Sequence, residues 1–499
     1  MGVFNIEIII VGAGFGGLSA AAFLAREGYD VTVLEKNEQP GGRANVYQEK
    51  DYYFDMGPSW YLMPDVYKNF YAEFGKKPED YFELEKLDPS YRIFYYDQKV
   101  IDLHPQMEKN YATFETFEAG GGLKLKKYLE SSRELYEFSI EEMLYKDYNS
   151  ILDLLNGKLL LKGYKLRLWE NLQNYVEKQF KSDEARKILE YAIGFLGGAP
   201  DKTPSFYHLV SHADLTMGVY YPQGGMRRVV ESVYQLAQSY GAKFVFNQTV
   251  ENLEVEDNII KSVHTSNTVY NPDLVIMNAD YHHSEIELLP EKNQSYNERY
   301  WESRTLSPSA MVIYLGIDKK IDKLAHHNLF LNKDWEKGFD KVFDPEKAAW
   351  PEYPSYYVNV PSITDKSAAP EGSDTLYILV PLAHTLEDTP QLREEFFNLI
   401  IDDLESKIGY NIRENIVVKK IFALNDFKNR YNAYKGTAFG LTHTLKQTAL
   451  WRPAHHSKKV KNLYYTGQYT HPGIGVPMTM VSSQIVYKDI KKKYPIKNK

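Results

Sequence analysis

The sequence predicts an α/β protein: a Rossmann-like nucleotide-binding domain assembled from discontinuous segments, with an inserted α+β domain and a helical part. Three observations lead to this prediction. A β-branched run at residues 6–11 ends in a glycine-rich turn, and a helix of small residues follows it. A second glycine-rich turn follows a strand-like run at residues 463–466, near the other end of the chain. At 499 residues the chain also exceeds one ordinary hydrophobic core, so two or three domain-sized units are expected.

The composition is that of a folded protein and excludes several classes of function. Hydrophobic residues make up 43% and charged residues 25%. The net charge of −8 comes from 59 basic and 67 acidic residues without a long block of either sign, so we expect no nucleic-acid partner. Cysteine is absent, which excludes disulfides, thiolate metal sites and a cofactor attached through sulfur. The histidine pairs have diverging side chains, so no metal site is expected.

Targeting signals are weak, and we expect a cytoplasmic protein. The first residues carry no cationic region, so a signal peptide is not expected. Residues 8–25 form an uncharged run long enough to suggest a membrane span. Its spaced glycines and the acidic residue at the end of the following strand fit a strand, a turn and a helix better. We therefore expect no transmembrane helix.

The N-terminal turn has the spacing of a dinucleotide-binding motif. Its residues are Gly12, Ala13, Gly14, Phe15, Gly16 and Gly17. In this motif Gly12 makes the tight turn, Gly14 lets the backbone reach a pyrophosphate, and Gly17 lets the helix pack closely on the strand. The helix N-terminus offers free N–H groups to the phosphates. Glu35 ends the second strand, 18 residues past Gly17, where a carboxylate can accept both ribose hydroxyls and would repel the 2′-phosphate of NADP.

A second glycine pair narrows the nucleotide to FAD. Glu35 is followed by Lys36 and then by Gly41, Gly42 and Arg43, with Gly57, Pro58 and Ser59 further on. A nicotinamide dehydrogenase has no need for this second pair. The ribityl chain and ring of a flavin extend past the pyrophosphate, and a glycine pair lets the backbone approach them while an arginine anchors nearby. We therefore expect FAD, bound non-covalently.

The C-terminal block completes the expected flavin site. A strand at residues 463–466 leads into Gly467 and Gln468, and an apolar helix is expected to begin near Met478, after Gly475 and Val476. The positive end of such a helix would point at the pyrimidine edge of the flavin. Reduced flavin is negatively charged there, so the helix dipole would favour reduction.

Residues 12–43 and 54–59 resemble the FAD-binding start of the bacterial and fungal phytoene desaturases. The similarity continues through residues 87–92, 218–226, 273–280, 361–365 and 369–372, and residues 462–478 resemble the family's terminal flavin signature. The resemblance implies that Val250 and Asn278 also contact the flavin. Two pairs depart from the pattern, because residues 468–469 and 478–479 are larger than is usual in the family. These departures leave FAD unaffected but put the substrate subtype in question.

The resemblance also implies a division into domains. Residues 1–75, 218–290 and 438–499 would bind FAD, and residues 76–217 and 291–437 would bind substrate. The first substrate stretch is largely helical by pattern, for example at residues 113–138 and 183–195, and residues 113–200 would form a membrane-contacting part. The second contains strand-like runs at residues 310–315 and 375–380.

Residues 151–169 carry leucines that alternate with basic residues and end in a tryptophan. This composition is typical of a helix lying in a membrane interface. It is equally typical of a core-facing helical hairpin with a solvated basic face, and the residues alone slightly favour that second interpretation. The resemblance to phytoene desaturases favours the membrane-interface helix instead, because the carotenoids on which that family acts dissolve only in bilayers. The lysines at 491–493 would add weak attraction to anionic lipid or form a solvated end. We therefore expect a cytoplasmic protein that associates peripherally with a membrane.

The reaction implied by the resemblance is desaturation of a carotenoid, by hydride transfer from an allylic carbon to flavin N5. Overall likeness favours 3,4-desaturation of a 1-hydroxycarotenoid, followed by phytoene desaturation, carotenoid isomerisation, flavin amine oxidation and a non-catalytic flavin-binding role. Oxygen or a membrane quinone would reoxidise the flavin. A delocalised cation loses its proton easily, so no catalytic acid or base is assigned. His212, Asp214 and Glu170 are polar groups of the substrate region without a distinguishing signal, and residues 60–61 and 356–357 could line an apolar tunnel.

Overall fold

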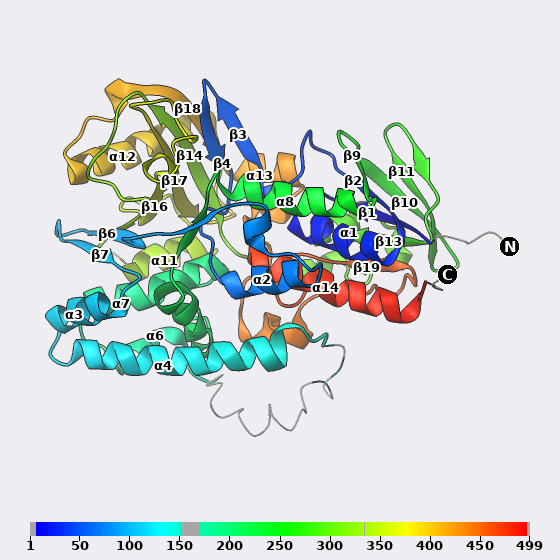
Figure 1. Ribbon diagram of the computed structural model, residues 1–499, viewed down its shortest axis with the longest axis horizontal. Coiled ribbons are helices and arrows are strands. Elements are labelled where there is room, and N and C mark those ends of the chain that lie inside the picture. The colour runs from blue at the N-terminus through cyan, green and yellow to red at the C-terminus, as the bar shows by residue number, and fades with distance from the viewer. Residues whose placement is uncertain (1–5, 149, 151–152, 154–168, 334, 497–499) are drawn as a thin grey trace.

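A five-stranded parallel sheet forms the nucleotide-binding part in the computed structural model, which describes residues 6–148, 150, 153, 169–333 and 335–496 (Figure 1). The strand order is β19-β13-β1-β2-β9, and all four pairings are parallel. The strands are β1 (Glu7–Val11), β2 (Asp30–Leu34), β9 (Lys243–Val245), β13 (Leu274–Met277) and β19 (Leu463–Tyr465). Three distant stretches of sequence therefore build one sheet, as predicted.

Both faces of this sheet are covered, which explains the continuous apolar run of β1. Ile8 and Ile10 pack against the helices α1 (Phe15–Glu27), α8 (Met226–Ser239) and α14 (Val476–Lys493). Ile9 and Val11 face the opposite way, into a core shared with a small antiparallel sheet. That sheet consists of β10 (Val250–Glu256), β11 (Ile259–Thr265) and β12 (Val269–Tyr270). Parallel strands buried on both faces have this composition. The strand–turn–helix interpretation of the uncharged run at 8–25 is confirmed.

A seven-stranded, mostly antiparallel sheet forms the second part, at the upper left of Figure 1. Its strands, in spatial order, are β18 (Ile416–Phe422), β14 (Ser309–Ile317), β17 (Asp374–Leu382), β16 (Tyr356–Asn359), β15 (His327–Leu331), β6 (Tyr91–Tyr95) and β7 (Val100–Leu103). Helix α12 (Pro390–Ile408) packs on one face through Phe396 and Ile400. The strands expected at 310–315 and 375–380 are confirmed as the paired β14 and β17.

The helical part lies below this sheet in Figure 1 and differs from the prediction in two ways. Its helices are α3 (Met107–Phe117), α4 (Gly121–Ser139), α6 (Leu172–Glu177) and α7 (Asp183–Glu190), the last continuing as a tighter turn through residues 191–196. The helix expected at 113–138 is two helices. They pack so closely that a Cβ on Gly121 would lie 2.0 Å from the carbonyl oxygen of Phe114. The strands β6 and β7, which extend the seven-stranded sheet, were not predicted.

Short elements connect the two parts. The hairpin β3 (Val46–Glu49) and β4 (Tyr52–Asp55) lies against the seven-stranded sheet, where a Cβ on Gly316 would lie 2.8 Å from the ring of Tyr52. The remaining α-helices and strands of the described residues are α2 (Pro64–Ala72), β5 (Leu84–Lys86), β8 (Tyr220–Pro222), α9 (Tyr281–Ile286), α10 (Glu298–Glu302), α11 (Trp335–Phe343) and α13 (Leu424–Tyr431). The chain thus crosses repeatedly between the parts, and the expected domain boundaries stay a prediction.

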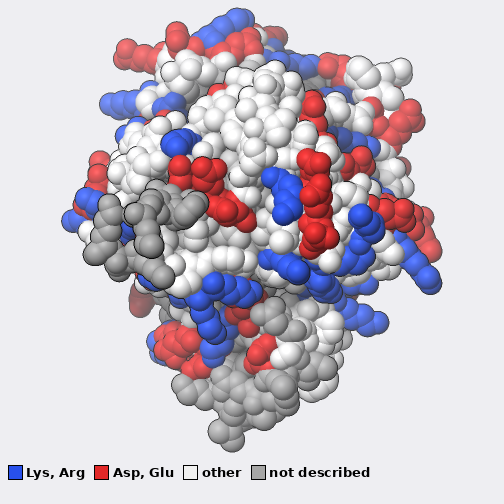
Figure 2. All heavy atoms as spheres, turned by 90° about the vertical axis from the view of Figure 1, so that its right-hand side faces the viewer, with Lys and Arg blue, Asp and Glu red and all other residues white. Residues whose placement is uncertain are grey.

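The predicted membrane features are only partly within the described residues. Of the segment at 151–169, only Asp153 and Trp169 are described, so the prediction of an interfacial helix there falls outside the described residues. No helix among the described residues combines the length and the apolar character needed to span a bilayer. At the end of α14, Lys491 pairs with Glu27 and Lys493 with Asp489. Figure 2 shows acidic and basic side chains interspersed over the face that carries the chain ends.

Candidate functional site

A cavity of about 670 Å³ lies where the carboxyl ends of the parallel strands meet the seven-stranded sheet and the helical part. Ligands of open α/β sheets bind at this edge. The predicted cofactor residues line this cavity, except for Ala13 and Gly17. Because the sequence places these residues hundreds of positions apart, their convergence is the main structural observation about the site.

The glycine-rich turn has the predicted geometry. Gly12 has a φ of 101°, in the left-handed region, and a Cβ on Gly17 would lie 2.0 Å from the carbonyl oxygen of Gly12. This geometry is that of a tight turn at Gly12 with the backbone of Gly17 packed directly against it. Helix α1 starts at Phe15 without a side-chain cap, so the N–H groups of its first turn stay available to a ligand. The side chain of Asn278 occupies the space beside Gly16, where a Cβ would lie 2.3 Å from its Oδ1.

Glu35 lies on the cavity wall and is 4% exposed. Its Oε2 accepts the backbone N–H of Ala13 at 2.8 Å, and its Oε1 accepts that of Asn37 at 2.9 Å. Oε1 also accepts the side-chain N–H of Asn37 at 2.8 Å, so the carboxylate is fixed and Oε2 keeps a second lone pair for a ligand. The geometry suits a carboxylate that accepts hydroxyl groups from a ribose. Ala13 thus contributes through Glu35 and not through the cavity wall.

Arg43 and Gln468 line the cavity and carry buried side-chain donors without a partner among the described residues. They are Nε and Nη2 of Arg43 and Nε2 of Gln468. Buried donors are rarely left unpaired, so these two side chains are suited to a ligand rich in oxygen. Arg43 follows the pair Gly41–Gly42, and the φ of Gly41 is 119°, a conformation that glycine adopts readily. The guanidinium of Arg43 lies 5.4 Å from the ring centre of Tyr431. Lys36, by contrast, donates to Asn429 and Asn432 at 2.9 Å.

The N-terminus of α14 points its first turn at the same cavity. Gly475, with a φ of 120°, precedes the helix without a side-chain cap. Val476 and Met478 of the first turn line the cavity. The helix begins two residues before the expected position near Met478. Its free N–H groups and its dipole favour negative charge on a bound ring.

The other wall of the cavity is uncharged. Its side chains come from the seven-stranded sheet, from α11 and from the turns at 191–210, and include Ala310, Val312, Leu329, Leu379, Pro381, Phe206 and Phe339. Within the described residues, the Asp, Glu, Lys and Arg side chains that line the cavity are Glu35, Lys36, Arg43, Asp280 and Arg430, all on the nucleotide side. Trp60, Tyr356 and Tyr357 lie on the wall as expected, whereas Tyr61 stacks on Tyr67 at 4.1 Å instead.

A buried polar chain starts at two residues of the cavity wall, Ser59 and Tyr357, and leads to His327 behind it. Ser59 Oγ and the hydroxyl of Tyr357 are 2.8 Å apart, and that hydroxyl is 2.6 Å from His327 Nδ1. Burial holds the pKa of His327 well below its usual range, with a smaller effect from His326. The histidine is therefore neutral, and the chain adds no charge to the cavity. Among the described residues no cluster of three His, Asp or Glu side chains is placed to hold a metal ion.

The three polar groups of the substrate region that the sequence could not distinguish differ in burial and in hydrogen-bond partners. Glu170 is half-buried and pairs with Lys178. His212 is buried, and burial lowers its pKa. Asp214 is 1% exposed, and its Oδ2 accepts hydroxyl groups from Tyr191 at 2.8 Å and Tyr91 at 3.0 Å. Tyr191 lines the cavity, but Asp214 itself does not.

Replacing Asp214 by asparagine is expected to flatten the pH dependence of stability. Burial raises the pKa of Asp214 to about 7, against roughly 4 for an exposed aspartate. The folded carboxyl therefore keeps a proton that the unfolded chain releases. The bound proton therefore stabilises the folded state at low pH. As the pH rises from about 4 to about 7, the free energy of unfolding falls by up to about 1.4 kcal/mol per pH unit. Denaturant unfolding of the wild type and Asp214→Asn at pH 5, 6, 7 and 8 measures the difference.

Tyr91→Phe is the matched control, because it removes one hydrogen bond and keeps the carboxyl. It should lower stability and retain the pH slope. Equal slopes in the wild type and in Asp214→Asn would contradict the prediction.

Other residues of the site were not identified from the sequence. Tyr469 donates its hydroxyl to Asp280 Oδ2 at 2.6 Å, and its ring occupies the space that a Cβ on Gly440 would need. The large residue at position 469, one of those that depart from the family pattern, thus fits because Gly440 leaves room for its ring. Arg452 lies behind the same loop, and His443 contacts Tyr207. These partners lie far apart in the chain, so a single sequence carries no local signal for them.

Comparison with known proteins identifies the family. Residues 15–486 match the family described as flavin containing amine oxidoreductase. The carotenoid 3,4-desaturase of Haloarcula japonica is 43% identical over 481 residues, which cover 96% of this chain and 96% of that protein. A zeta-carotene-forming phytoene desaturase of Myxococcus xanthus is 31% identical, over 96% of this chain and 93% of that protein.

Solved structures share the fold at much lower identity. An oxidoreductase from Methanosarcina mazei superposes with a TM-score of 0.63 and 16% identity, covering 97% of this chain and 100% of that one. A putrescine oxidase solved with putrescine superposes with a TM-score of 0.62 and 14% identity, covering 98% and 99%. At these identities the likeness concerns the fold alone.

Proposed function

The chain belongs to the family of flavin-containing amine oxidoreductases, and on this premise we propose that it is an FAD-dependent carotenoid desaturase. The reaction introduces a C=C bond into a polyene by removing two hydrogens from neighbouring carbons. The chain is 43% identical to a carotenoid 3,4-desaturase over 96% of both chains, and this similarity supports a carotenoid as the substrate. The predicted cofactor residues around the cavity would hold the FAD.

The uncharged wall of the cavity is the observation that carries the proposal. An amine oxidase has to accommodate an ammonium or amine group beside its flavin. The described residues offer no carboxylate on the wall formed by the seven-stranded sheet and the turns at 191–210. A long hydrocarbon loses no hydrogen bonds on entering such a wall and gains by leaving water. The cavity therefore fits a polyene better than an amine.

Bound FAD supplies a two-electron acceptor for the hydride that leaves an allylic carbon. The chain contributes position and exclusion of water. Side chains such as Ala310, Val312 and Leu379 hold one C–C bond against the cofactor side of the cavity, which replaces an encounter by a fixed geometry. The remaining positive charge is spread over the conjugated chain, so its second hydrogen leaves as a proton without a strong base. We assign no catalytic acid or base.

We infer 3,4-desaturation of a 1-hydroxycarotenoid as the reaction, with phytoene desaturation as the alternative. The first is supported by the relative from Haloarcula japonica, which is named a carotenoid 3,4-desaturase. The second is supported by the phytoene desaturase of Myxococcus xanthus, at 31% identity. Both reactions use the same cofactor, so the choice between them depends on the apolar wall. Oxygen or a membrane quinone would accept the electrons.

Exposed apolar side chains near the cavity support a peripheral membrane contact. Trp451 is 51% exposed and Leu445 42% exposed, and they flank Thr448 and Ala449 on the cavity wall. Trp169 is 89% exposed. Tryptophan and leucine on a surface insert readily into a membrane interface. We propose that this side of the molecule faces the bilayer that holds the carotenoid.

A liposome assay tests the function. Purified protein with bound FAD is incubated with vesicles carrying phytoene, γ-carotene or a 1-hydroxycarotenoid, and the absorption spectrum is followed. We expect a red shift with the 1-hydroxycarotenoid, since each added conjugated bond lowers the excitation energy, and co-sedimentation of the protein with the vesicles. A shift with phytoene alone would select the alternative. No shift with any carotenoid, together with bleaching of the flavin by a simple amine, would refute the proposal.

A further inference from the structure

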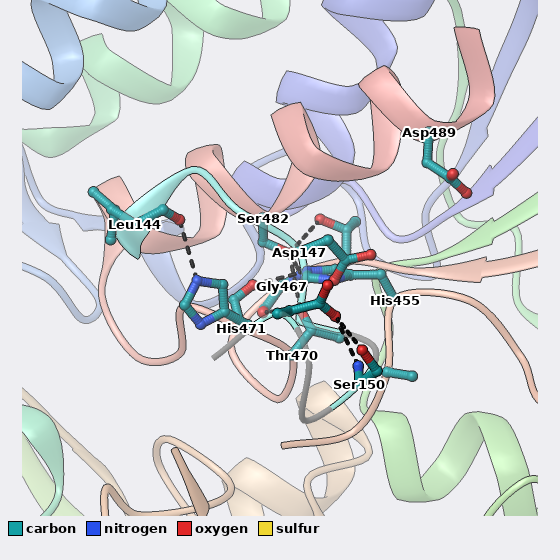
Figure 3. A network of polar contacts seen from close by, with 12 residues as sticks. Leu144, Asp147, Ser150, His455, Gly467, Thr470, His471, Ser482 and Asp489 are labelled. Carbon is teal, nitrogen blue, oxygen red and sulfur yellow. Dashed lines mark hydrogen bonds and ion pairs between the residues drawn. The ribbon is translucent and has the colours of Figure 1, made fainter. Parts of the chain in front are cut away.

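In the loop between β19 and α14, residues 467–471, side chains donate hydrogen bonds to four of the backbone carbonyl oxygens. Thr470 Oγ1 donates to the carbonyl of Gly467 at 2.9 Å, and His455 Nε2 donates to that of His471 at 2.8 Å. Figure 3 shows Thr470 and His455 close to Ser482 of α14, with which Thr470 shares a hydrogen bond of 2.8 Å. The loop is therefore fixed at both of its ends.

Arg452 binds the two central carbonyls of this loop. Its Nη2 donates to Gln468 at 2.8 Å and its Nε donates to Tyr469 at 3.1 Å. The same guanidinium donates to the carbonyls of Leu441 at 3.2 Å and Gln447 at 3.1 Å. Arg452 is 4% exposed, and in the part of the chain that the structure describes it forms no ion pair with a carboxylate. Burial lowers its pKa to about 10, so the side chain is still cationic at neutral pH.

These bonds determine where the N–H groups of the loop point. The C=O and N–H of one planar peptide point in opposite directions. The carbonyl of Gln468 is held by Arg452, so the N–H of Tyr469 is directed away from Arg452. Neither this N–H nor that of Gln468 meets an acceptor among the described residues, and Gln468 Nε2 is buried without a partner. Both residues line the cavity. Consecutive free N–H groups form an anion-binding concavity.

The loop lies next to the N-terminus of α1. A Cβ on Gly16 would lie 3.4 Å from Cα of Gly467. The donors of the loop and the free N–H groups of α1 therefore border the same part of the cavity. We propose that Arg452 is a positioning residue for the diphosphate of FAD: it holds the carbonyls of Gln468 and Tyr469 back so that the loop presents donors to the phosphate oxygens.

A guanidinium is needed for this role. Its planar fork serves four carbonyl groups at fixed directions, whereas a lysine ammonium offers three rotating donors from one point. A lysine at position 452 would keep the positive charge but not the geometry of these hydrogen bonds. The inference rests on the proposed flavin site and not on the carotenoid, so a protein that bound FAD but converted no carotenoid would leave it intact.

Flavin binding by full-length variants tests the proposal. Wild type, Arg452→Lys and Arg452→Gln are stripped of flavin and titrated with FAD and with riboflavin, which lacks the diphosphate, and the quenching of flavin fluorescence is followed. Both variants are expected to bind FAD about tenfold more weakly or worse, and to bind riboflavin within about twofold of wild type. Arg393→Lys is the matched control, because Arg393 pairs with Asp388 and Asp426 away from the cavity.

Two outcomes would overturn the proposal. FAD affinity within twofold of wild type in both variants would show that Arg452 does not position the loop. Equal losses for FAD and riboflavin would show that Arg452 only supports the fold. Should Arg452→Gln fail to fold, Arg452→Lys decides alone, with its thermal unfolding compared with that of Arg393→Lys.

Discussion

Gly17→Ala is expected to abolish FAD binding. The new Cβ would lie 2.0 Å from the carbonyl oxygen of Gly12, a backbone atom that cannot rotate away. Helix α1 would have to move off β1, and the N–H groups at its N-terminus would lose their direction toward the diphosphate. We expect a drop in FAD affinity of roughly a hundredfold or more, which corresponds to about 3 kcal/mol. The ratio of flavin to protein absorbance after purification measures it.

Gly75→Ala distinguishes this steric effect from the general cost of replacing a glycine. Gly75 has a φ of 66°, and a Cβ there would meet nothing within 4 Å. The substitution should cost about 1 kcal/mol in backbone strain and leave the flavin content unchanged. A Gly17→Ala protein that retains a full complement of FAD would show that the helix and the strand can separate without losing the site.

The nucleotide-binding half could be predicted because its signals are local. The β-branched run before Gly12, the helix after it and the acid at Glu35 are adjacent in the chain, and each has one structural meaning. The substrate half has no such signals. Strands β6 and β7 join a sheet whose other members lie more than 200 residues away, so their pairing depends on tertiary contacts that no short pattern encodes.

The same reasoning separates the predicted from the unpredicted parts of the site. Glycines that must be glycine, such as Gly12 and Gly41, are recognisable because only this residue adopts their φ without strain. Arg452 is one of many arginines, and its role depends on four carbonyl groups that the fold brings together. Likewise, Asp214 is distinguished from Glu170 by its burial and by its two tyrosine partners, which the sequence does not reveal.

Filling the cavity at Ala310 is expected to stop carotenoid conversion without displacing FAD. Ala310 is a small residue on the uncharged wall, on β14, opposite Pro381 of β17, which also lines the cavity. A larger side chain there would project into the space proposed for the polyene, on the wall away from Glu35 and Arg43. Conversion by Ala310→Val, Ala310→Phe and Ala310→Trp should fall in that order, reaching background with tryptophan, while the flavin absorbance per protein stays constant.

Ala383→Phe is the matched control for added bulk. Ala383 is 2% exposed but does not line the cavity, so overpacking there should cost about 1–3 kcal/mol of stability and leave conversion per bound flavin unchanged. The two variants together separate blockage from destabilisation, because both add a large ring to a buried position and only one adds it to the cavity. Wild-type conversion by Ala310→Trp would place the polyene outside this cavity. Loss of FAD along with activity would instead mean that flavin and polyene do not occupy separate walls.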